Sequence, residues 1–253
     1  MQARVKDIVS IIDALAPFDT ALPWDNVGLL AGDPESVVTC VVTALDVTPG
    51  VVEEAKRLGA QLIVTHHPIL FSPVQRVCAD DPQGSLILSM LRAGISMIAA
   101  HTNWDLARGG SNDALMQAAG FEGAVGEGFL RTAELTPPLA PEALQRTLGE
   151  RLKTQALFYG DRARPVRRLA CCSGAGGEEL PAAAKAGADC YLTGELKHHE
   201  LLEAMQRGLR VALVGHGPSE EPAADALNRA LQSQADALQY SVRVIRSKVN
   251  PFV

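Results

Sequence analysis

Two adjacent histidines end the apolar run of residues 62–69, LIVTHHPI. Histidine is scarce in this chain, with 6 among 253 residues. Neutral imidazole binds divalent metal ions, and neighbouring side chains of an extended strand point in opposite directions. His66 and His67 would therefore serve two ions better than one, and the pair suggests a dinuclear site. The alternative is a turn that carries two polar side chains before Pro68.

A second segment, HTNWD, also follows an apolar run. It offers His101 and, four residues later, Asp105. A carboxylate on such a loop could join a metal that imidazole already binds. The alternative for Asp105 is the capping of a helix.

The third segment, GHGPSE, places His216 and Glu220 four residues apart. Gly217 and Pro218 argue against a simple helix there, so we expect a loop that wraps around an ion and presents both side chains. A glutamate can bridge two ions with its two oxygens. The alternative is a helix that begins at Ser219, which would act as its cap.

A second histidine pair occurs in GELKHHELLEA. Glu195 precedes His198 by three residues, a spacing found in carboxylate-bridged di-iron bundles. Those bundles need two such motifs on long helices, and this chain has one. We therefore predict that His198 and His199 form a solvated first helical turn and are not metal ligands. The glycine-rich SGAGGEE lacks the lysine of a phosphate-binding loop.

The elements that would position these residues follow a repeated pattern. A helix-like stretch, a glycine and an apolar run occur in that order four times, as in VVEEAKRLGAQLIVTHHP, where Gly59 precedes His66 by seven residues. The glycine ends the helix, and the apolar run is typical of a strand covered on both faces. Such alternation predicts an α/β fold with mainly parallel, helix-covered sheets, whose ligands bind beyond the carboxyl ends of the strands.

The periodicity assigns most of the chain to regular elements. Strand candidates besides the repeated runs are residues 37–46 and 167–176. Predicted helices cover residues 5–15, 50–58, 84–92, 111–119, 141–153, 178–186, 198–206 and 222–235.

The repeated units form two pairs, separated by a stretch rich in glycine and proline. We therefore expect two α/β lobes. Residues 1–123 form the first, which carries His66, His67 and Asp105. Residues 124–253 form the second, whose C-terminal part, about residues 216–253, carries His216 and Glu220 and packs back on the first lobe.

Composition narrows the classes of partner. The net charge of −6 and the pI near 5.5 argue against nucleic acid held on a broad basic surface. We expect no membrane partner, because no apolar run is long enough to span a bilayer, and the N-terminus does not read as a signal peptide. An odd count of 5 cysteines without C-x-x-C favours the reducing cytoplasm.

Six blocks in order carry a resemblance that covers nearly the whole chain. They are WDNVGLLAGDP, TALDVTP, AQLIVTHHPILF, AHTNWDLARGGSNDAL, GADCYLTGELKHHE and GHGPSEEPAADAL. Together they resemble the dinuclear-metal-centre hexamer family, whose members are named GTP cyclohydrolase I type 2 homologues and are related to a eukaryotic NGG-interacting factor. The chain departs from the family pattern at GEGFLRTAEL and at its end, SKVNPFV. Neither segment contains a candidate ligand, although both put shared substrate contacts in doubt.

The resemblance implies a site and an assembly. It implies two divalent metal ions per chain, two interlocked lobes and a toroidal homohexamer. Zinc, manganese, iron and nickel all suit such donors. The implied metal ligands are His66, His67, Asp105, His216 and Glu220. His101 is near these ligands but not among them, and it is the candidate proton carrier or a partner that orients a ligand.

The leading functional hypothesis is a metal-dependent hydrolase that acts through a metal-bridged water. By resemblance its substrate is a small molecule such as a nucleotide, with ring opening at GTP as the chemistry that the family name implies. The sequence shows no site for recognising a base, and a phosphoester or another cyclic substrate fits equally. The alternative is a metal-binding assembly or interaction protein without turnover.

Overall fold

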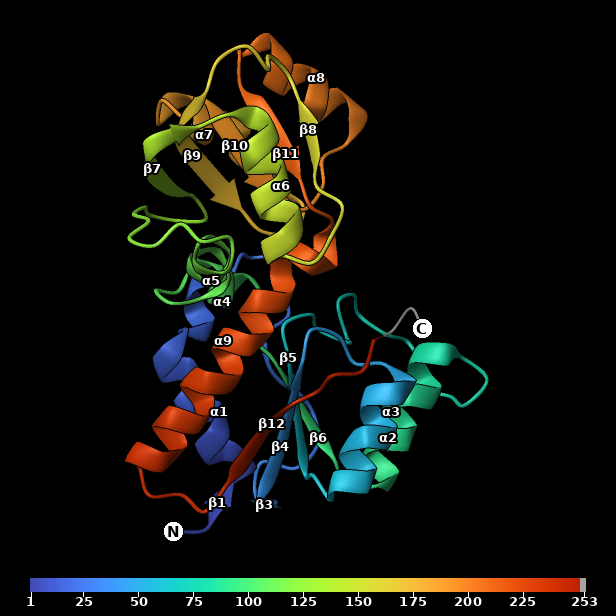
Figure 1. The fold of residues 1–253 in the computed structure, drawn as a ribbon. Helices are drawn as coiled ribbons and strands as arrows, with labels where there is room; N and C mark the ends of the chain where they lie inside the picture. The colour runs from blue at the N-terminus through green and yellow to red at the C-terminus, as the bar shows by residue number, and fades with distance from the viewer. Residues whose placement is uncertain (251–253) are drawn as a thin grey trace. The chain divides into compact units, whose positions relative to one another are not determined.

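The computed structural model describes residues 1–250 and forms two compact units. Unit 1 comprises Met1–Ala107 and Ala224–Val253, and unit 2 comprises Arg108–Ala223. Figure 1 shows that each unit has a sheet flanked by helices. Within the described residues, no helix is long and apolar enough to cross a membrane.

Unit 1 is built on a five-stranded sheet in the order β12-β4-β5-β6-β2. The first four strands run parallel to one another, and β2 pairs with β6 in the antiparallel direction. A short antiparallel pair, β1 and β3, lies apart from this sheet. The elements are β1 (Ala3–Arg4), α1 (Val5–Leu15), η1 (Phe18–Thr20), β2 (Gly28–Ala31), β3 (Val37–Val38), β4 (Cys40–Ala44), α2 (Pro49–Leu58), β5 (Leu62–Thr65), α3 (Pro82–Arg92), β6 (Ser96–Ala99), α4 (Thr102–Leu106), β12 (Arg243–Arg246) and most of α9 (His216–Ala237).

Local sequence explains why α2 begins and ends where it does. The side chain of Thr48 caps its first turn by accepting a hydrogen bond from Val51 N, and Pro49 occupies the first helical position. Gly59 ends it with φ of 64°, a left-handed conformation that glycine adopts without steric cost. In Figure 1, α2 and α3 cover one side of the sheet, while α1 and α9 lie on the other.

Unit 2 contains a second five-stranded sheet in the order β7-β9-β10-β11-β8. Its three central strands are parallel, and both edge strands are antiparallel to their neighbours. The elements are α5 (Ser111–Ala118), β7 (Arg131–Leu139), α6 (Pro141–Arg151), β8 (Leu157–Tyr159), β9 (Val166–Cys172), η2 (Gly176–Glu179), α7 (Leu180–Lys185), β10 (Cys190–Thr193), α8 (His198–Gln206) and β11 (Arg210–Leu213).

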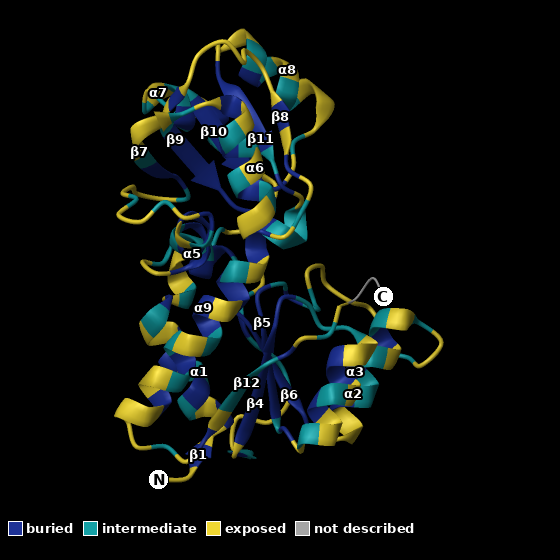
Figure 2. Cartoon of the chain, in the orientation of Figure 1, coloured by how far each residue is buried: buried dark blue, intermediate teal, exposed yellow. Residues whose placement is uncertain are grey.

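The sheet of unit 2 separates two hydrophobic clusters, because alternate residues of a strand face opposite sides. Cys190 and Leu192 of β10 belong to one cluster, and Tyr191 between them belongs to the other. Figure 2 shows these central strands as buried. Burial raises the pKa of the Cys190 thiol to about 12, so this cysteine is a small hydrophobic side chain of the core.

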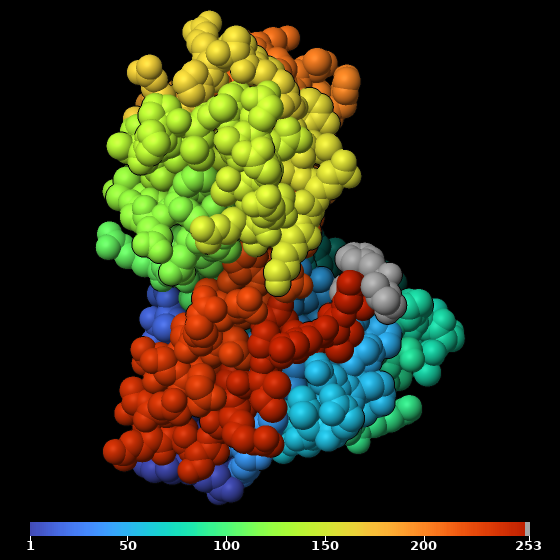
Figure 3. Space-filling model, in the orientation of Figure 1, coloured from blue at the N-terminus to red at the C-terminus, as the bar shows by residue number. Residues whose placement is uncertain are grey.

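The C-terminal segment completes the sheet of unit 1. Strand β12 pairs in parallel with β4, and Ser247 beyond it donates a hydrogen bond to Glu54 of α2. In Figure 3 these red C-terminal residues lie over the light-blue part of unit 1. Val249 packs against the same cluster as Val51. The last strand in the sequence is therefore part of the first unit.

The α/β class predicted from the sequence is confirmed, with two differences in arrangement. The first concerns strand direction: both edges of the unit 2 sheet and one edge of the unit 1 sheet are antiparallel, so the sheets are mixed. The second concerns the boundary between residues 123 and 124, because residues 108–123 group with unit 2. The reason is packing: Leu115 and Met116 of α5 belong to a core cluster of unit 2. Residues 224–253 group with unit 1, on which the C-terminal part was expected to pack.

The start of α9 corrects the expectation of a loop in GHGPSE, residues 215–220. The helix begins at His216 and contains Gly217 and Pro218 in its first turn. A proline is tolerated there, because the first amides of a helix make no hydrogen bond within it. Gly215, with φ of 89°, turns the chain out of β11 just before the helix.

Candidate metal centre

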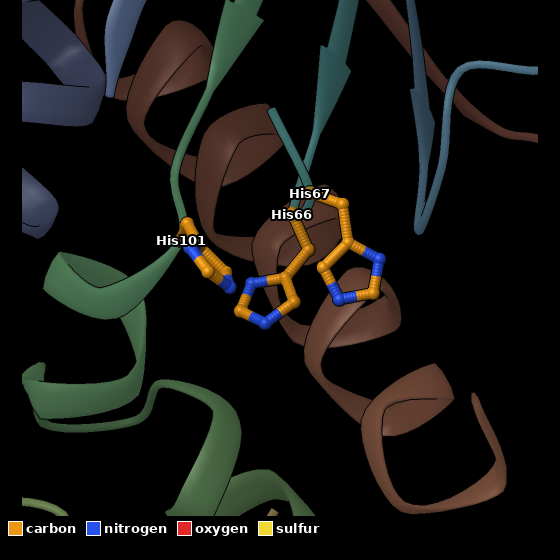
Figure 4. Close-up of side chains that lie close together, drawn as sticks. All are labelled: His66, His67 and His101. Carbon is orange, nitrogen blue, oxygen red and sulfur yellow. The ribbon is translucent and has the colours of Figure 1, made fainter. Parts of the chain in front are cut away.

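Three imidazoles of unit 1 lie together beyond the carboxyl ends of β5 and β6. His66 and His67 directly follow β5, and His101 follows β6 after one further residue. The two strands are parallel with Thr65 opposite Ala99, so their ends meet at the same edge of the sheet. Figure 4 shows the three rings close together. One ring nitrogen from each lies within 4.8 Å of the others, which is close enough for a shared metal ion.

The adjacent pair does not diverge as an extended strand predicts. The ring centroids of His66 and His67 are 5.0 Å apart, with 46° between the ring planes. The chain turns here because β5 ends at Thr65, whose hydroxyl donates a hydrogen bond to the carbonyl of His67 (2.7 Å). The expectation of opposite directions was wrong, and both imidazoles face the same region.

Hydrogen bonds at Nδ1 fix the orientation of all three rings. His66 Nδ1 donates to the carbonyl of Ala100 (3.0 Å), and His67 Nδ1 to Asp46 Oδ1 (2.8 Å). His101 Nδ1 donates to Asp25 Oδ1 (2.9 Å). Such partners set the tautomer in which Nε2 carries the lone pair, and they are the usual outer partners of metal-binding histidines.

Asp25 is the most enclosed of these orienting groups, with no exposed side-chain surface. Burial opposes its ionisation, but hydrogen bonds from His101 and Thr102 and the charge of His101 outweigh it and hold the pKa of Asp25 well below its usual range. Its Oδ2 accepts hydrogen bonds from both the amide (3.0 Å) and the hydroxyl (2.5 Å) of Thr102. His101 is therefore held by an ionised carboxylate.

The carboxylate of Asp105 lies beside the imidazole of His66. Its Oδ1 is 3.6 Å from His66 Nε2, and its side chain is 14% exposed while that of His66 is fully buried. Asp105 belongs to α4, a short helix that directly follows His101. The structure thus brings four predicted site residues of unit 1 together, and Asp105 sits on a helix rather than a loop.

The two predicted ligands of unit 2 also face each other. His216 Nε2 lies 3.1 Å from Glu220 Oε2, one turn further along α9. His216 Nδ1 contacts Glu195 Oε1 at 3.1 Å, so Nε2 of this ring is again directed by a carboxylate on its other nitrogen. The buried hydroxyl of Ser219 donates to His216 O (2.7 Å) and accepts from Gly174 N (2.9 Å), which fastens the helix start to the end of β9.

Gly174 makes room for the carboxylate of Glu220. A Cβ at this position would lie 2.3 Å from Glu220 Oε1 and 3.4 Å from His216 Cε1, and φ is +63°. The segment SGAGGEE therefore has a structural role that its sequence did not reveal: it lets a glutamate approach the main chain.

The second histidine pair lies at the surface. His198 and His199 are both exposed and begin α8, as predicted. Glu200 in the same turn accepts a hydrogen bond from Lys197 N (2.7 Å) and so acts in helix capping. Neither histidine belongs to a group of potential metal donors in the described residues.

These donors suit a divalent transition metal ion. Imidazole nitrogen and carboxylate oxygen are its usual protein ligands, and all four rings have Nδ1 engaged with an oxygen atom. Comparison with known proteins identifies the family of this chain. The model of Duf34/NIF3 (NGG1p interacting factor 3) matches residues 3–251. The chain belongs to this family.

Curated relatives and solved structures support the assignment. A GTP cyclohydrolase 1 type 2 homolog from Clostridium perfringens is 33% identical over 244 residues, covering 92% of this chain and 93% of the relative. A homolog of the same name from Clostridium acetobutylicum is 31% identical, covering 99% of this chain and 97% of the relative. The crystal structure of Staphylococcus aureus protein SA1388 superposes with a TM-score of 0.94 at 26% identity, covering 98% and 97% of the two chains.

Sequence reasoning missed the residues that orient the rings. Asp25 precedes His101 by 76 positions and Asp46 precedes His67 by 21, so no local spacing connects them. A signal existed for Asp46, which follows strand β4 and therefore reaches the same sheet edge as His67. Glu195 follows β10 in the same way. Asp25 lies in a loop and gave no such signal.

Proposed function

We propose that this protein binds two divalent metal ions per chain and is a metal-dependent hydrolase. The proposed ligands are His66, His67, Asp105, His216 and Glu220. The observation that carries the proposal is the grouping of two of these ligands with a third: ring nitrogens of His66 and His67 lie within 4.8 Å of each other, and Asp105 Oδ1 lies 3.6 Å from His66 Nε2.

The geometry within each unit supports this ligand set. In unit 1 the imidazole of His66 lies beside the carboxylate of Asp105, and in unit 2 His216 lies beside Glu220. Desolvation favours tight coordination, because His66 is fully buried and the side chain of Glu220 is only 6% exposed. Glu220 would hold both ions, because a carboxylate offers two oxygen atoms.

Two divalent ions supply the nucleophile in hydrolases of this kind, by lowering the pKa of a bound water and stabilising the charge that develops in the transition state. The residues of the chain then have separate roles. His101 holds or moves a proton at Nε2, because its Nδ1 is committed to Asp25. The low pKa of Asp25 keeps that carboxylate ionised at neutral pH, and so fixes the tautomer.

The substrate proposed is a small molecule with a hydrolysable ring or ester, and a purine nucleotide is the first candidate. The curated relatives carry the name GTP cyclohydrolase 1 type 2 homolog, which suggests ring opening at GTP. A non-catalytic metal-binding protein is the competing function.

The proposed assembly is a toroidal homohexamer of interlocked lobes in the cytoplasm, by resemblance to the family. Buried thiols such as Cys40 and Cys190 suit a reducing compartment. Light scattering at micromolar protein concentration tests the assembly. A mass of six chains is expected, and a stable monomer would contradict it.

A turnover screen tests the enzymatic function. The protein is loaded with zinc, manganese, iron or nickel and incubated with nucleotides, phosphodiesters and cyclic amides. We expect metal-dependent product release that is lost in His66→Ala and kept in a His198→Ala, His199→Ala control. His101→Ala should keep both metal ions and lose turnover. Turnover that persists in His66→Ala, or loss of an ion in His101→Ala, would contradict the assigned roles.

A further inference from the structure

Two aromatic side chains of unit 1 lie exposed beside the imidazole cluster. Trp24 is 56% exposed and Phe71 is 52% exposed, although large hydrophobic side chains are usually buried. Their ring centroids are 5.7 Å apart at an angle of 52°. Both rings meet His101 nearly edge to face, at 6.1 Å for Trp24 and 6.2 Å for Phe71. An open aromatic surface thus borders the candidate proton carrier.

Hydrogen bonds hold the two loops that carry these rings. Asp25, next to Trp24, is anchored by His101 and Thr102, and Leu22 N donates to the Thr102 hydroxyl (3.0 Å). Asn26 Nδ2 donates to the carbonyl of Leu70 (2.5 Å), so it joins the loop of Trp24 to the loop of Phe71. The segment Trp-Asp-Asn therefore presents a ring, orients a histidine and fixes the neighbouring loop.

We propose that Trp24 and Phe71 form a stacking platform for the flat heteroaromatic ring of the substrate. This inference rests on the proposed function and specifies the substrate class of the same site. Aromatic side chains bind flat rings of many kinds through their faces, which requires exposed rings in fixed positions. A ring on this platform lies next to His101, whose ring centroid is 5.0 Å from that of His66.

The observations favour a small ring over a second copy of the chain. A stable protein interface buries about 800 Å² on each partner, whereas two half-exposed aromatic rings offer roughly 200 Å². The surroundings are also polar, because the exposed Asn26 lies two residues after Trp24 and the imidazole of His101 contacts the ring of Trp24. Polar groups beside two exposed rings are typical of a ligand site.

Binding of guanosine to the chelator-treated, full-length protein tests the proposal, with uridine and ribose 5-phosphate as comparison probes. Calorimetry should show guanosine binding that weakens about tenfold or more in Trp24→Ala and in Phe71→Ala. Trp24→Phe should retain most of it, because the ring remains. Leu91→Ala, which removes an exposed apolar side chain of α3, is the matched control and should bind as the wild type does.

Fluorescence gives a second readout that does not depend on the folding of an alanine variant. The chain has 2 tryptophans, and Trp104 is only 2% exposed. With excitation selective for tryptophan, guanosine should quench the wild-type emission and leave that of Trp24→Phe unchanged, since the buried Trp104 is then the remaining tryptophan. Ribose 5-phosphate, which has no aromatic ring, should quench neither protein.

Three results would overturn the platform. They are the absence of guanosine and uridine binding to wild type, guanosine binding that is insensitive to Trp24→Ala and Phe71→Ala, and a change in oligomeric mass in Trp24→Ala without a change in nucleoside affinity. The last would make this surface a contact between copies. Failure of the metal proposal is distinguishable, because it shows in a metal titration of the wild type, and Trp24→Ala should titrate as the wild type does.

Discussion

Both units present potential ligands beyond the carboxyl ends of parallel strands, but they support them differently. Unit 1 offers the imidazoles of His66 and His67, each fixed at Nδ1, and the carboxylate of Asp105 beside His66. Unit 2 offers His216, 38% exposed on the first turn of a helix, and the buried carboxylate of Glu220. Unit 1 therefore has enough donors to hold an ion by itself, whereas the pair of unit 2 offers only two.

The carboxylates that orient the imidazoles also differ in burial between the two units. Asp25 has no exposed side-chain surface, while Glu195 is 59% exposed. Solvent weakens an exposed ion pair, so a buried partner holds its imidazole more firmly. The comparison teaches that a buried partner holds the imidazole of His101 in unit 1 in place, whereas the partner of His216 in unit 2 is open to solvent.

The largest expected effect separates Glu220 from Asp105. If Glu220 bridges both ions, Glu220→Gln should cost both under conditions where Asp105→Asn costs mainly one. Loss of the bridge also leaves two cations with less negative charge between them, and even unit charges about 4 Å apart interact by about 4 kcal/mol at an effective dielectric of 20. Metal titration of the two variants side by side is the measurement. One ion retained at near wild-type affinity in Glu220→Gln would make Glu220 a terminal ligand.

The next largest effect is a difference in unfolding free energy between variants of the two orienting carboxylates, Asp25 and Glu195. Asp25→Asn should lower the free energy of unfolding at pH 7 by about 2 kcal/mol, because a buried, hydrogen-bonded charge is lost. Glu195→Gln should change it by less than about 0.5 kcal/mol. Urea unfolding of both variants measures this, and equal losses would remove the contrast between the units.

The loss of stability in Asp25→Asn should depend on pH. The pKa of Asp25 is lower in the folded chain than in the unfolded chain, so its contribution to stability is present above the unfolded-state pKa and is lost as pH falls toward the folded-state value. The stability gap between wild type and Asp25→Asn should therefore narrow on acidification. A gap that widens would show that the ionised carboxylate is not what stabilises this loop.

A smaller effect tests the space at Gly174. Alanine at Gly174 and at Gly208 meets the same backbone penalty, about 1 kcal/mol, since both have positive φ. Only Gly174 lies against Glu220, and nothing lies within 4 Å of a Cβ at Gly208. Gly174→Ala should therefore weaken metal binding while Gly208→Ala does not. Identical titrations of the two variants would show that Glu220 does not need this space.

The smallest expected effect is none. His198 and His199 are exposed at the start of α8, and neighbouring side chains of a helix diverge by about 100°. The double alanine variant should keep the wild-type metal content and unfolding free energy. Elemental analysis measures the metal content, and urea unfolding measures the free energy. The loss of one ion would identify a ligand pair on that helix.

Much of the fold was predictable because helix ends and buried strands have local signals. Gly59 predicted the end of a helix, and the apolar run after it predicted a strand. The structure has both, as the end of α2 and as β5. The start of α9 was not predictable from Gly217 and Pro218 alone, because a residue that breaks a helix interior is tolerated in a first turn.

The candidate site was predictable to a similar degree. His66, His67 and His101 could be placed together from the rule that parallel strand ends meet at one edge. Their hydrogen-bond partners could not, since Asp25 lies in a loop whose path depends on packing far along the chain. The turn that brings the rings of His66 and His67 together also escaped prediction, because it depends on where β5 stops.

Metal stoichiometry tests the central claim most directly. The protein is stripped with chelator, titrated with zinc or manganese, and analysed for bound metal per chain, with the intact mass of the assembly measured in parallel. The account predicts two equivalents per chain, falling below two in His66→Ala. Saturation at one equivalent or fewer in the wild type would contradict a dinuclear centre.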